Sequence, residues 1–423
     1  GGGDGLIGKI AKRVKRKIVL RPDESIMKSE EDAKKLIHEI VPEAAEITNL
    51  YFDSCYREII IQCQNPGEAV GRRGANLNAI RDQTGWLVKV ERTSPIVSKT
   101  VHDIRGYRQA HAPERRKLLK DFGLNIHRPQ RPGSAWARVT ALGSYREVGR
   151  ACHFVTTNES RIMIDVGVNI ASDTDPMPYF TAPEALPLEK LDAVVLTHSH
   201  LDHAGMLPVL FKYGYRGPVY CTPPTRDLML LLQTDYLKVG GAEGKRAPYD
   251  MEDIRTCMKH VVDVDWGETT DIAPDVKLTF SNAGHILGSS AVHLHIGEGK
   301  HNIVFSGDQK YEKSWLFDAA NTRFPRVETL VIESTYGASG DYQPSRQEAN
   351  QELQDIVSRT ISRGGKLICP VFAVGRSQEV MIAIDELFRS GQVKPVPVWL
   401  DGMIQEATAI HASHPDYLTS SLR

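Results

Sequence analysis

The chain has 423 residues, of which 41% are apolar and 25% charged, a balance that excludes a wholly disordered protein and predicts two to four domains. The formal net charge is -1, but residues 1–135 hold 25 basic and 17 acidic residues, whereas residues 136–423 hold 27 and 36. No apolar run approaches the roughly 18 residues of a membrane-spanning helix. The basic front indicates either an anion-binding module or an ordinary solvated surface.

The cysteines and the chain ends give two further expectations. Six cysteines are scattered without a CxxC pair, which favours a reducing cytoplasm over a secreted, disulfide-stabilised protein. We expect all six to be buried or half-buried: Cys55, Cys63, Cys152, Cys221, Cys257 and Cys369. The chain opens on glycines without Met and stops at Arg423 without turn-like punctuation, so we expect a fragment of a longer protein.

Residues 30–92 carry a regular succession of short patterns. Apolar spacing predicts a helix over 30–40, and β-rich runs predict strands over 46–51 and 58–63. Pro66 begins a short helix, residues 71–74 interrupt it, and a second helix ends at Gly85 before a strand over 86–90. The interrupting residues are Gly71, Arg72, Arg73 and Gly74.

This order, with a GxxG turn between two helices, resembles a KH domain of the αββααβ type over residues 29–96. The resemblance implies that residues 71–74 bind phosphates of single-stranded RNA, because glycines allow close backbone approach and arginines add charge. A plain helix–turn–helix with a basic turn is the alternative. Gly2 and Gly5 share the GxxG spacing, and a basic helix (6–16) and a strand (18–20) follow, so residues 1–28 are interpreted as the remnant of a first KH domain.

Residues 97–135 are expected to connect this module to the acidic body. The stretch 101–122 predicts one basic helix ending near Gly123. Pro129, Pro132 and Gly133 then indicate an irregular linker.

Five strand-like runs of the body each lead to a carboxylate or a histidine. The residues that follow them are Asp165, the group His198, His200, Asp202 and His203, then His285, Asp308 and Glu333. Side chains at the carboxyl ends of parallel strands gather at one edge of a sheet, so five such endings predict one site. Imidazole and carboxylate are the common Zn²⁺ ligands, about three or four per ion. We expect His198, His200 and His285 to hold one ion, Asp202 and His203 a second, and Asp308 to bridge them.

The run HxHxDH, with a distant His and a distant Asp, resembles the metallo-β-lactamase fold. Residues 198–205 match its second motif, and Asp165, His285 and Asp308 match its first, third and fourth. The resemblance implies an αββα sandwich over residues 136–345 and an orienting role for Asp165 in place of metal ligation. A hydrolase acting on a small ester, thioester or lactam uses the same ligands and stays open as an alternative.

Residues 333–337, 366–379 and 397–402 resemble the β-CASP branch of that superfamily, whose members process nucleic acids. The resemblance implies an inserted α/β domain over residues 346–423, with helices at about 346–363 and 374–390 alternating with strands over 366–371 and 397–402. Glu333 is the candidate acid that pairs with a histidine general acid. His411 and His414 fit neither later histidine motif and are interpreted as structural, so we expect the domain to be incomplete.

Together these parts resemble archaeal homologues of the catalytic subunit of the cleavage and polyadenylation specificity factor, and predict a multidomain chain of α+β and α/β class. The resemblance implies a ribonuclease with two Zn²⁺ ions, endonucleolytic with 5′-to-3′ exonuclease activity in some members, in 3′-end formation or transcription termination. The implied catalytic residues are Asp165, Asp202, His203, Asp308 and Glu333. The implied partners are single-stranded, often U-rich RNA, the transcription machinery including RNA polymerase, and a second copy through a C-terminal region absent here. A catalytically inactive RNA-binding scaffold is the other open alternative.

Overall fold

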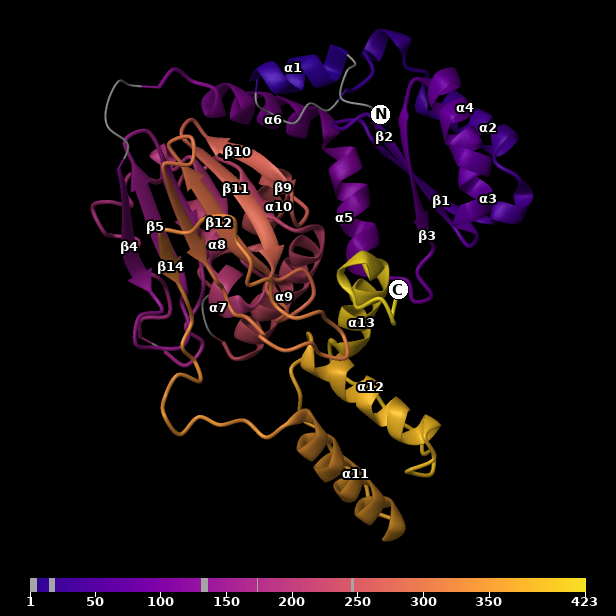
Figure 1. The fold of residues 1–423 in the computed structure, drawn as a ribbon, viewed down its shortest axis with the longest axis vertical. Helices are drawn as coiled ribbons and strands as arrows, with labels where there is room; N and C mark the ends of the chain where they lie inside the picture. The colour runs from indigo at the N-terminus through magenta and orange to yellow at the C-terminus, as the bar shows by residue number, and fades with distance from the viewer. Residues whose placement is uncertain (1–5, 15–19, 131–135, 173, 245–246) are drawn as a thin grey trace. The chain divides into compact units, whose positions relative to one another are not determined.

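A computed structural model describes residues 6–14, 20–130, 136–172, 174–244 and 247–423 (Figure 1). The chain divides into two compact units, one of residues 1–94 and 105–116, and the other of residues 95–104 and 117–423. The GxxG spacing at residues 2–5 and most of the strand predicted over 18–20 lie outside the described residues. Within the described part of the chain, no helix is both long and apolar enough to cross a membrane.

The first unit contains a three-stranded sheet in the order β1-β2-β3. β1 and β2 are antiparallel, whereas β2 and β3 are parallel, as a connection through helices requires. Its elements are α1 (Leu6–Val14), α2 (Glu30–Ile40), β1 (Ile47–Asp53), β2 (Glu58–Cys63), α3 (Pro66–Val70), α4 (Ala75–Thr84) and β3 (Leu87–Arg92). From α2 onward this is the order expected from the sequence.

Local chemistry fixes the turn between α3 and α4. Gly71 and Gly74 have φ values of 71° and 78°, in the left-handed region that favours glycine. Arg73 between them also has a positive φ, of 53°. A Cβ on Gly71 would lie 2.8 Å from the amide group of the Asn76 side chain, which would have to shift. Arg72 and Arg73 remain exposed on this turn.

The connector differs from the prediction of one helix over 101–122. Two helices form, α5 (Lys99–Ala110) and α6 (Ala112–Ile126), and they meet at His111. Pro113 is the second residue of α6, and its ring has no N–H to donate and would clash with the carbonyl four residues earlier in a continuous helix. The break therefore falls just before this proline. The second helix also continues beyond Gly123, which is in open space.

The second unit contains two sheets (Figure 1). A six-stranded sheet has the order β4-β5-β6-β7-β8-β9, and a five-stranded sheet has the order β10-β11-β12-β13-β14. The strands are β4 (Ala137–Gly143), β5 (Cys152–Thr157), β6 (Arg161–Ile164), β7 (Ala193–Val195), β8 (Val219–Cys221), β9 (Val261–Asp263), β10 (Thr269–Ala273), β11 (Val276–Asn282), β12 (Ser290–Ile296), β13 (His301–Phe305) and β14 (Thr329–Val331). The predicted mixed, multi-sheet class is confirmed.

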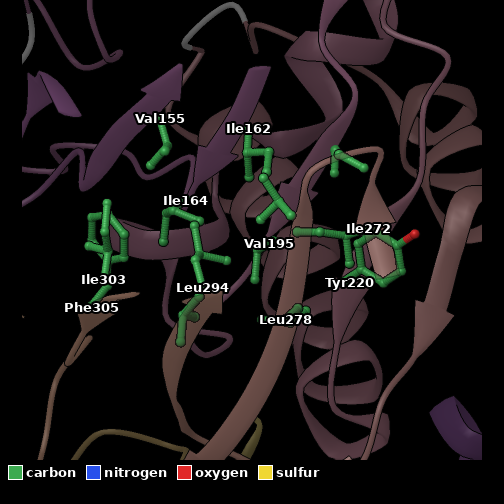
Figure 2. Packing of buried hydrophobic residues seen from close by; sticks show 14 of the residues in the cluster. Val155, Ile162, Ile164, Val195, Tyr220, Ile272, Leu278, Leu294, Ile303 and Phe305 are labelled. Carbon is green, nitrogen blue, oxygen red and sulfur yellow. The ribbon is translucent and has the colours of Figure 1, made fainter. Parts of the chain in front are cut away.

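The core of this unit lies between the two sheets (Figure 2). Ile162, Ile164 and Val195 come from the six-stranded sheet, and Leu278 and Leu294 from the five-stranded sheet, all at most 1% exposed. Alternation along each strand places these side chains on the inner face. The tight core fixes the strand ends, where the predicted ligands follow.

Helices complete the second unit. α7 (Leu201–Ala204), α8 (Leu207–Lys212), α9 (Pro223–Ala242) and α10 (Met251–His260) connect strands of the six-stranded sheet, and α11 (Arg346–Ser362), α12 (Arg376–Arg389) and α13 (Ile404–Ser413) follow β14. A second apolar cluster includes Leu228 of α9, Val374, and Ile410 of α13, so residues that follow β14 pack on α9 within the same unit.

Two expectations for residues 346–423 are wrong. In this described stretch no strand forms over 366–371 or 397–402, since a β-strand needs a hydrogen-bonding neighbour and none is present there. Cys369, in the first of these runs, is consequently exposed, whereas the other five cysteines are buried as expected. The two predicted helices, in contrast, form as α11 and α12.

Candidate metal centre

The centre is built on the loop that follows β7. Residues 196–200 leave the buried strand, and α7 begins at Leu201, so the motif residues are delivered on both sides of one short turn. His198 is fully buried and His203 is 8% exposed. Asp165 follows β6, which pairs with β7, and Asp308 follows β13 of the other sheet, and both reach the same place.

The first group of ligand atoms consists of three histidine nitrogens and one carboxylate oxygen. His200 Nδ1 lies 3.2 Å from His198 Nε2 and 3.2 Å from His285 Nε2. The Oδ2 atom of Asp308 lies 3.5 Å from His285 Nε2 and 3.9 Å from His198 Nε2. The structure therefore brings together the predicted first ligand set.

The second group uses the other oxygen of the same aspartate. Asp308 Oδ1 lies 3.2 Å from His203 Nε2, and Asp202 Oδ2 lies 3.9 Å from that nitrogen. These three atoms are mutually within 4.8 Å. One carboxylate thus faces both groups, one oxygen to each.

The spacing of the donor atoms fits a zinc site. Zinc binds imidazole at about 2.0–2.1 Å in tetrahedral geometry, which separates neighbouring ligand atoms by about 3.3 Å. The two separations of 3.2 Å between His200 and its neighbours match that value. Three imidazole nitrogens and one carboxylate oxygen that converge on one point are also a typical cation site.

Asp165 holds the second group from behind. Its Oδ2 atom accepts hydrogen bonds from His203 Nδ1 at 2.8 Å and from the Thr197 hydroxyl at 2.8 Å. Its Oδ1 atom accepts from the Thr197 amide at 2.7 Å. Since Nδ1 of His203 is thereby the protonated nitrogen, Nε2 faces Asp308 as a ligand atom. Asp165 itself lies outside both groups of ligand atoms, as its predicted orienting role requires.

Burial and charge prepare these groups for a cation. Burial lowers the pKa of His198 well below its usual range, and burial together with His200 lowers the pKa of His285 to about 3. Both rings are therefore neutral at pH 7, with lone pairs free to bind a metal.

His203 and Asp308 behave as a pair. Burial alone would lower the pKa of His203, but Asp165 and Asp308 outweigh it and raise that pKa well above its usual range. Burial would raise the pKa of Asp308, but the hydrogen bond and charge of His203 hold it below its usual range. The carboxylates thus attract positive charge at the position of the Nε2 proton, which a metal cation would replace.

Glu333 lies beside this centre but outside both groups. Its Oε1 atom accepts a hydrogen bond of 3.1 Å from the amide of Gln309, next to Asp308. Its Oε2 atom accepts from the Thr335 hydroxyl at 2.6 Å. This carboxylate is therefore fixed one residue away from the shared aspartate, and its role as the partner of a general acid stays a prediction.

Sequence reasoning missed two residues of the centre. The Thr197 hydroxyl donates to Asp165 and lies 3.0 Å from His198 Nδ1. Burial is the main cause of the lowered pKa of His200 and of His285, and Arg376, at the start of α12, is close enough for its charge to lower both further. Thr197 directly precedes the matched residues 198–205, whereas only the fold brings Arg376 near.

Residues 145–362 match the metallo-beta-lactamase superfamily. Fold, ligand groups and sequence agree, and the chain belongs to this superfamily, whose members are built around a metal centre.

The resemblance to archaeal proteins is also confirmed. The chain is 52% identical over 418 residues to "Transcription termination factor FttA" of Methanosarcina mazei, and 49% identical to the protein of that name from Methanothermobacter thermautotrophicus. Each alignment covers 99% of this chain and 66% of the relative. The protein of the same name from a Lokiarchaeum species is 45% identical over 98% of this chain and 65% of its own length. The chain thus spans about two thirds of these relatives.

Proposed function

We propose that the chain carries the catalytic centre of a zinc-dependent ribonuclease that cleaves single-stranded RNA in transcription termination or RNA 3′-end formation. Hydrolysis is expected inside the RNA strand, and 5′-to-3′ trimming of the products is proposed as a second activity of the same centre. RNA and the transcription machinery, RNA polymerase included, are the proposed partners.

One observation carries the proposal: Asp308 is shared between two groups of ligand atoms. Its Oδ2 atom is 3.5 Å from His285 Nε2, and its Oδ1 atom is 3.2 Å from His203 Nε2. A carboxylate that faces two sets of neutral or oriented imidazoles is suited to hold two cations side by side. When bound, such ions polarise a phosphoryl oxygen and lower the pKa of water between them.

The chain's own residues prepare that chemistry. His198, His200 and His285 would hold one ion, and Asp202 and His203 the other, with Asp308 common to both. Asp165 and Thr197 fix the ring of His203 so that Nε2 cannot turn away. Arg376 places positive charge beside the centre, which favours an anionic phosphodiester over a neutral ester or lactam.

RNA as the substrate is supported by the first unit and by the names of the relatives. Gly71, Arg72, Arg73 and Gly74 form an exposed basic turn between two helices, and the resemblance of this unit to a KH domain assigns such a turn to RNA phosphates. The relatives are named transcription termination factors, and nascent RNA is the polymer within reach of such a factor.

Cleavage of end-labelled RNA tests the proposal. Zinc-loaded protein is incubated with single-stranded RNA labelled at either end, beside chelator-treated protein and a His198→Ala/Asp308→Ala variant. We expect internal cuts with the loaded protein and at least a hundredfold less product in both controls. Intact RNA alongside rapid hydrolysis of a β-lactam or thioester would contradict the proposal and favour a small-molecule hydrolase. Binding of RNA without any zinc-dependent cleavage would favour the scaffold.

A further inference from the structure

The loop of residues 144–150, between β4 and β5, is unusually strained. Ser144, Arg146 and Arg150 have φ values of 65°, 63° and 43°, a region that residues with a side chain rarely adopt. Gly149 in the same loop has a φ of 106°. Strained backbone of this kind persists only where the surroundings enforce it, and it clusters at functional sites. The strain in this loop therefore indicates a role beyond connecting two antiparallel strands.

Polar contacts hold the loop in this conformation. Glu147 Oε1 accepts hydrogen bonds from the Ser144 amide at 3.2 Å and from Arg150 Nε at 2.7 Å. Arg150 Nη1 also donates to Asp175 Oδ2 at 2.6 Å. The loop is thus closed on itself and anchored to a second segment, so its side chains are displayed from a fixed backbone.

The loop also adjoins the metal centre. The amide of Ala151, at its end, donates to the carbonyl oxygen of Asp202 at 2.8 Å, and Asp202 belongs to the second ligand group. A Cβ on Gly167 would lie 2.7 Å from that amide and 1.6 Å from that carbonyl, so the two backbones touch here. Movement of the loop would therefore displace a predicted ligand.

Tyr145 is an aromatic residue displayed at this border. Its ring is half exposed, at 50%, and packs edge-on against His153 with centroids 5.6 Å apart. His153 in turn contacts Phe305, three residues before Asp308, with centroids 5.3 Å apart. His153 is also close enough to Asp165 and His203 for their charges to act on its pKa. One edge of the tyrosine thus rests on His153, which links it to the residues behind the second ligand group, and half of the residue faces solvent.

Arg146, the next residue, is exposed as well. Among the described residues its guanidinium has no ion pair. Arg150, four residues later in the same loop, is paired with Glu147 and Asp175. Proteins bind single-stranded nucleic acids with aromatic side chains that stack on bases and with basic side chains that pair with phosphates. Tyr145 and Arg146 supply one group of each kind on a fixed backbone.

We propose that Tyr145 and Arg146 form a nucleotide-binding wall of the metal centre. Tyr145 stacks on a base adjacent to the scissile phosphate, and Arg146 binds a neighbouring phosphate of the same strand. This inference rests on the proposed ribonuclease function and adds to it the residues that select a nucleic acid over a small phosphodiester.

Cleavage of paired substrates tests the stacking contact. One RNA oligonucleotide carries all bases, and matched oligonucleotides have a single abasic position on either side of the mapped cleavage site. We expect Tyr145→Ala to raise KM for the complete RNA about tenfold, since a stacked base contributes a factor of roughly 5 to 150. On the abasic RNA that lacks the stacked base, wild type and Tyr145→Ala should be equal within about twofold. Tyr145→Phe should behave as wild type on both substrates, because it keeps the ring.

A salt series tests the phosphate contact. Removal of one phosphate contact lowers the slope of log KM against log salt by about 0.7 for a single strand. Arg146→Ala should show that decrease, and Arg146→Lys should keep the wild-type slope. For Tyr145→Ala the matched control is Tyr213→Ala, because Tyr213 is 64% exposed at the end of α8 and belongs to no part of the wall. Unchanged zinc content shows that each variant is folded.

The outcomes separate this inference from the function on which it rests. Equal losses for Tyr145→Ala on complete and abasic RNA would overturn the stacking role while leaving ribonuclease activity intact. A wild-type protein that does not cleave RNA would refute the proposed function. In that case, RNA containing 5-iodouridine is cross-linked to the wild-type protein. A cross-link at Tyr145 would support the wall as an RNA-binding surface, and cross-links at other residues alone would overturn it.

Discussion

Asp165 is the residue on which the geometry of the second ligand group depends. It has a positive φ of 60°, which costs about 1–3 kcal/mol for a residue with a side chain, and is 1% exposed. In that position its two oxygens accept three hydrogen bonds, two from Thr197 and one from His203. The strain is thus compensated by contacts that orient a ligand.

Asp165→Asn should weaken the second metal ion selectively. The amide is neutral and holds the ring of His203 less firmly, and loss of such an outer contact typically costs about 10- to 100-fold in metal affinity. We expect zinc titration to show one site of unchanged affinity and one weakened site. Asp192→Asn is the control, since Asp192 is a buried aspartate that binds Arg128 and the Arg161 amide instead. Zinc affinities in Asp165→Asn that both equal those of the wild type would contradict the orienting role.

Gly167→Ala should disturb the same group through the backbone. The added Cβ would lie 1.6 Å from the carbonyl oxygen of Asp202, and neither backbone can yield without moving a ligand. We expect a loss of about 1–3 kcal/mol in the free energy of unfolding of metal-free protein, together with lower zinc content. Gly240→Ala provides the contrast, because Gly240 lies inside α9 with open space around it and should gain about 0.5–1 kcal/mol. The measurement is urea unfolding with metal analysis.

The sequence was most informative about residues whose chemistry and spacing are both unusual. The ligands from His198 to His203 stand within six positions, and the other two follow strands, so their convergence could be predicted. Arg376 stands 91 positions after His285. Its proximity to the centre follows from the packing of α12, which no local pattern encodes.

At the scale of elements, buried histidines connect stability to pH. His260, the last residue of α10, is 3% exposed, and its Nδ1 lies 2.9 Å from the Gly217 carbonyl oxygen. Burial lowers its pKa from 6.5 to about 4. A pKa lowered on folding means that the neutral ring is favoured, so this contribution to stability is complete above about pH 6.5 and is lost as the pH falls toward 4.

We therefore expect the free energy of unfolding of metal-free protein to fall between pH 6.5 and 4, and to fall less in His260→Gln. Glutamine keeps a donor for the Gly217 carbonyl but does not titrate in this range. Urea unfolding at half-unit pH steps provides the measurement, with chelator present so that loss of metal does not contribute. His38→Gln, an exposed position on α2, should leave the slope unchanged. An identical slope in His260→Gln would show that this ring is not responsible.

Helices and strands differed in how well they could be predicted. α2, α11 and α12 begin and end close to the predicted positions because their caps and apolar spacing are local; Ser29 and Ser345, for example, accept hydrogen bonds from amides of the first turn. The strands expected over 366–371 and 397–402 depend on a neighbouring strand, and neither run pairs with one in the described chain. Apolar spacing alone therefore cannot establish a strand, because its hydrogen-bonding partner is not local.

At the scale of the whole molecule, the two units carry different candidate sites. The basic front predicted from charge corresponds to the first unit with its exposed arginine turn, and the acidic body to the second unit with its ligand groups. The helix α5 belongs partly to each unit, which no feature of residues 97–135 indicated. RNA binding and metal binding are consequently expected to respond to different substitutions.

Arg72→Glu/Arg73→Glu should separate the two activities. Charge reversal on the turn between α3 and α4 is expected to weaken binding of single-stranded RNA at least tenfold and to reduce its salt dependence, because phosphate contacts are lost. Zinc content should not change. Lys9→Glu/Lys35→Glu makes the same change of charge at exposed helical positions and should weaken binding much less. Fluorescence anisotropy with labelled RNA measures both, and equal effects would show that net charge alone, not the turn, binds RNA.

The central claim is that one carboxylate joins two metal sites, and metal analysis of purified protein tests it most directly. Zinc per chain is measured for the wild type and for Asp308→Ala, with circular dichroism to establish that both are folded. We predict about two zinc ions in the wild type and a sharp loss from both groups in the variant. A folded wild-type protein that binds no zinc, or an Asp308→Ala variant that retains two ions, would contradict the account.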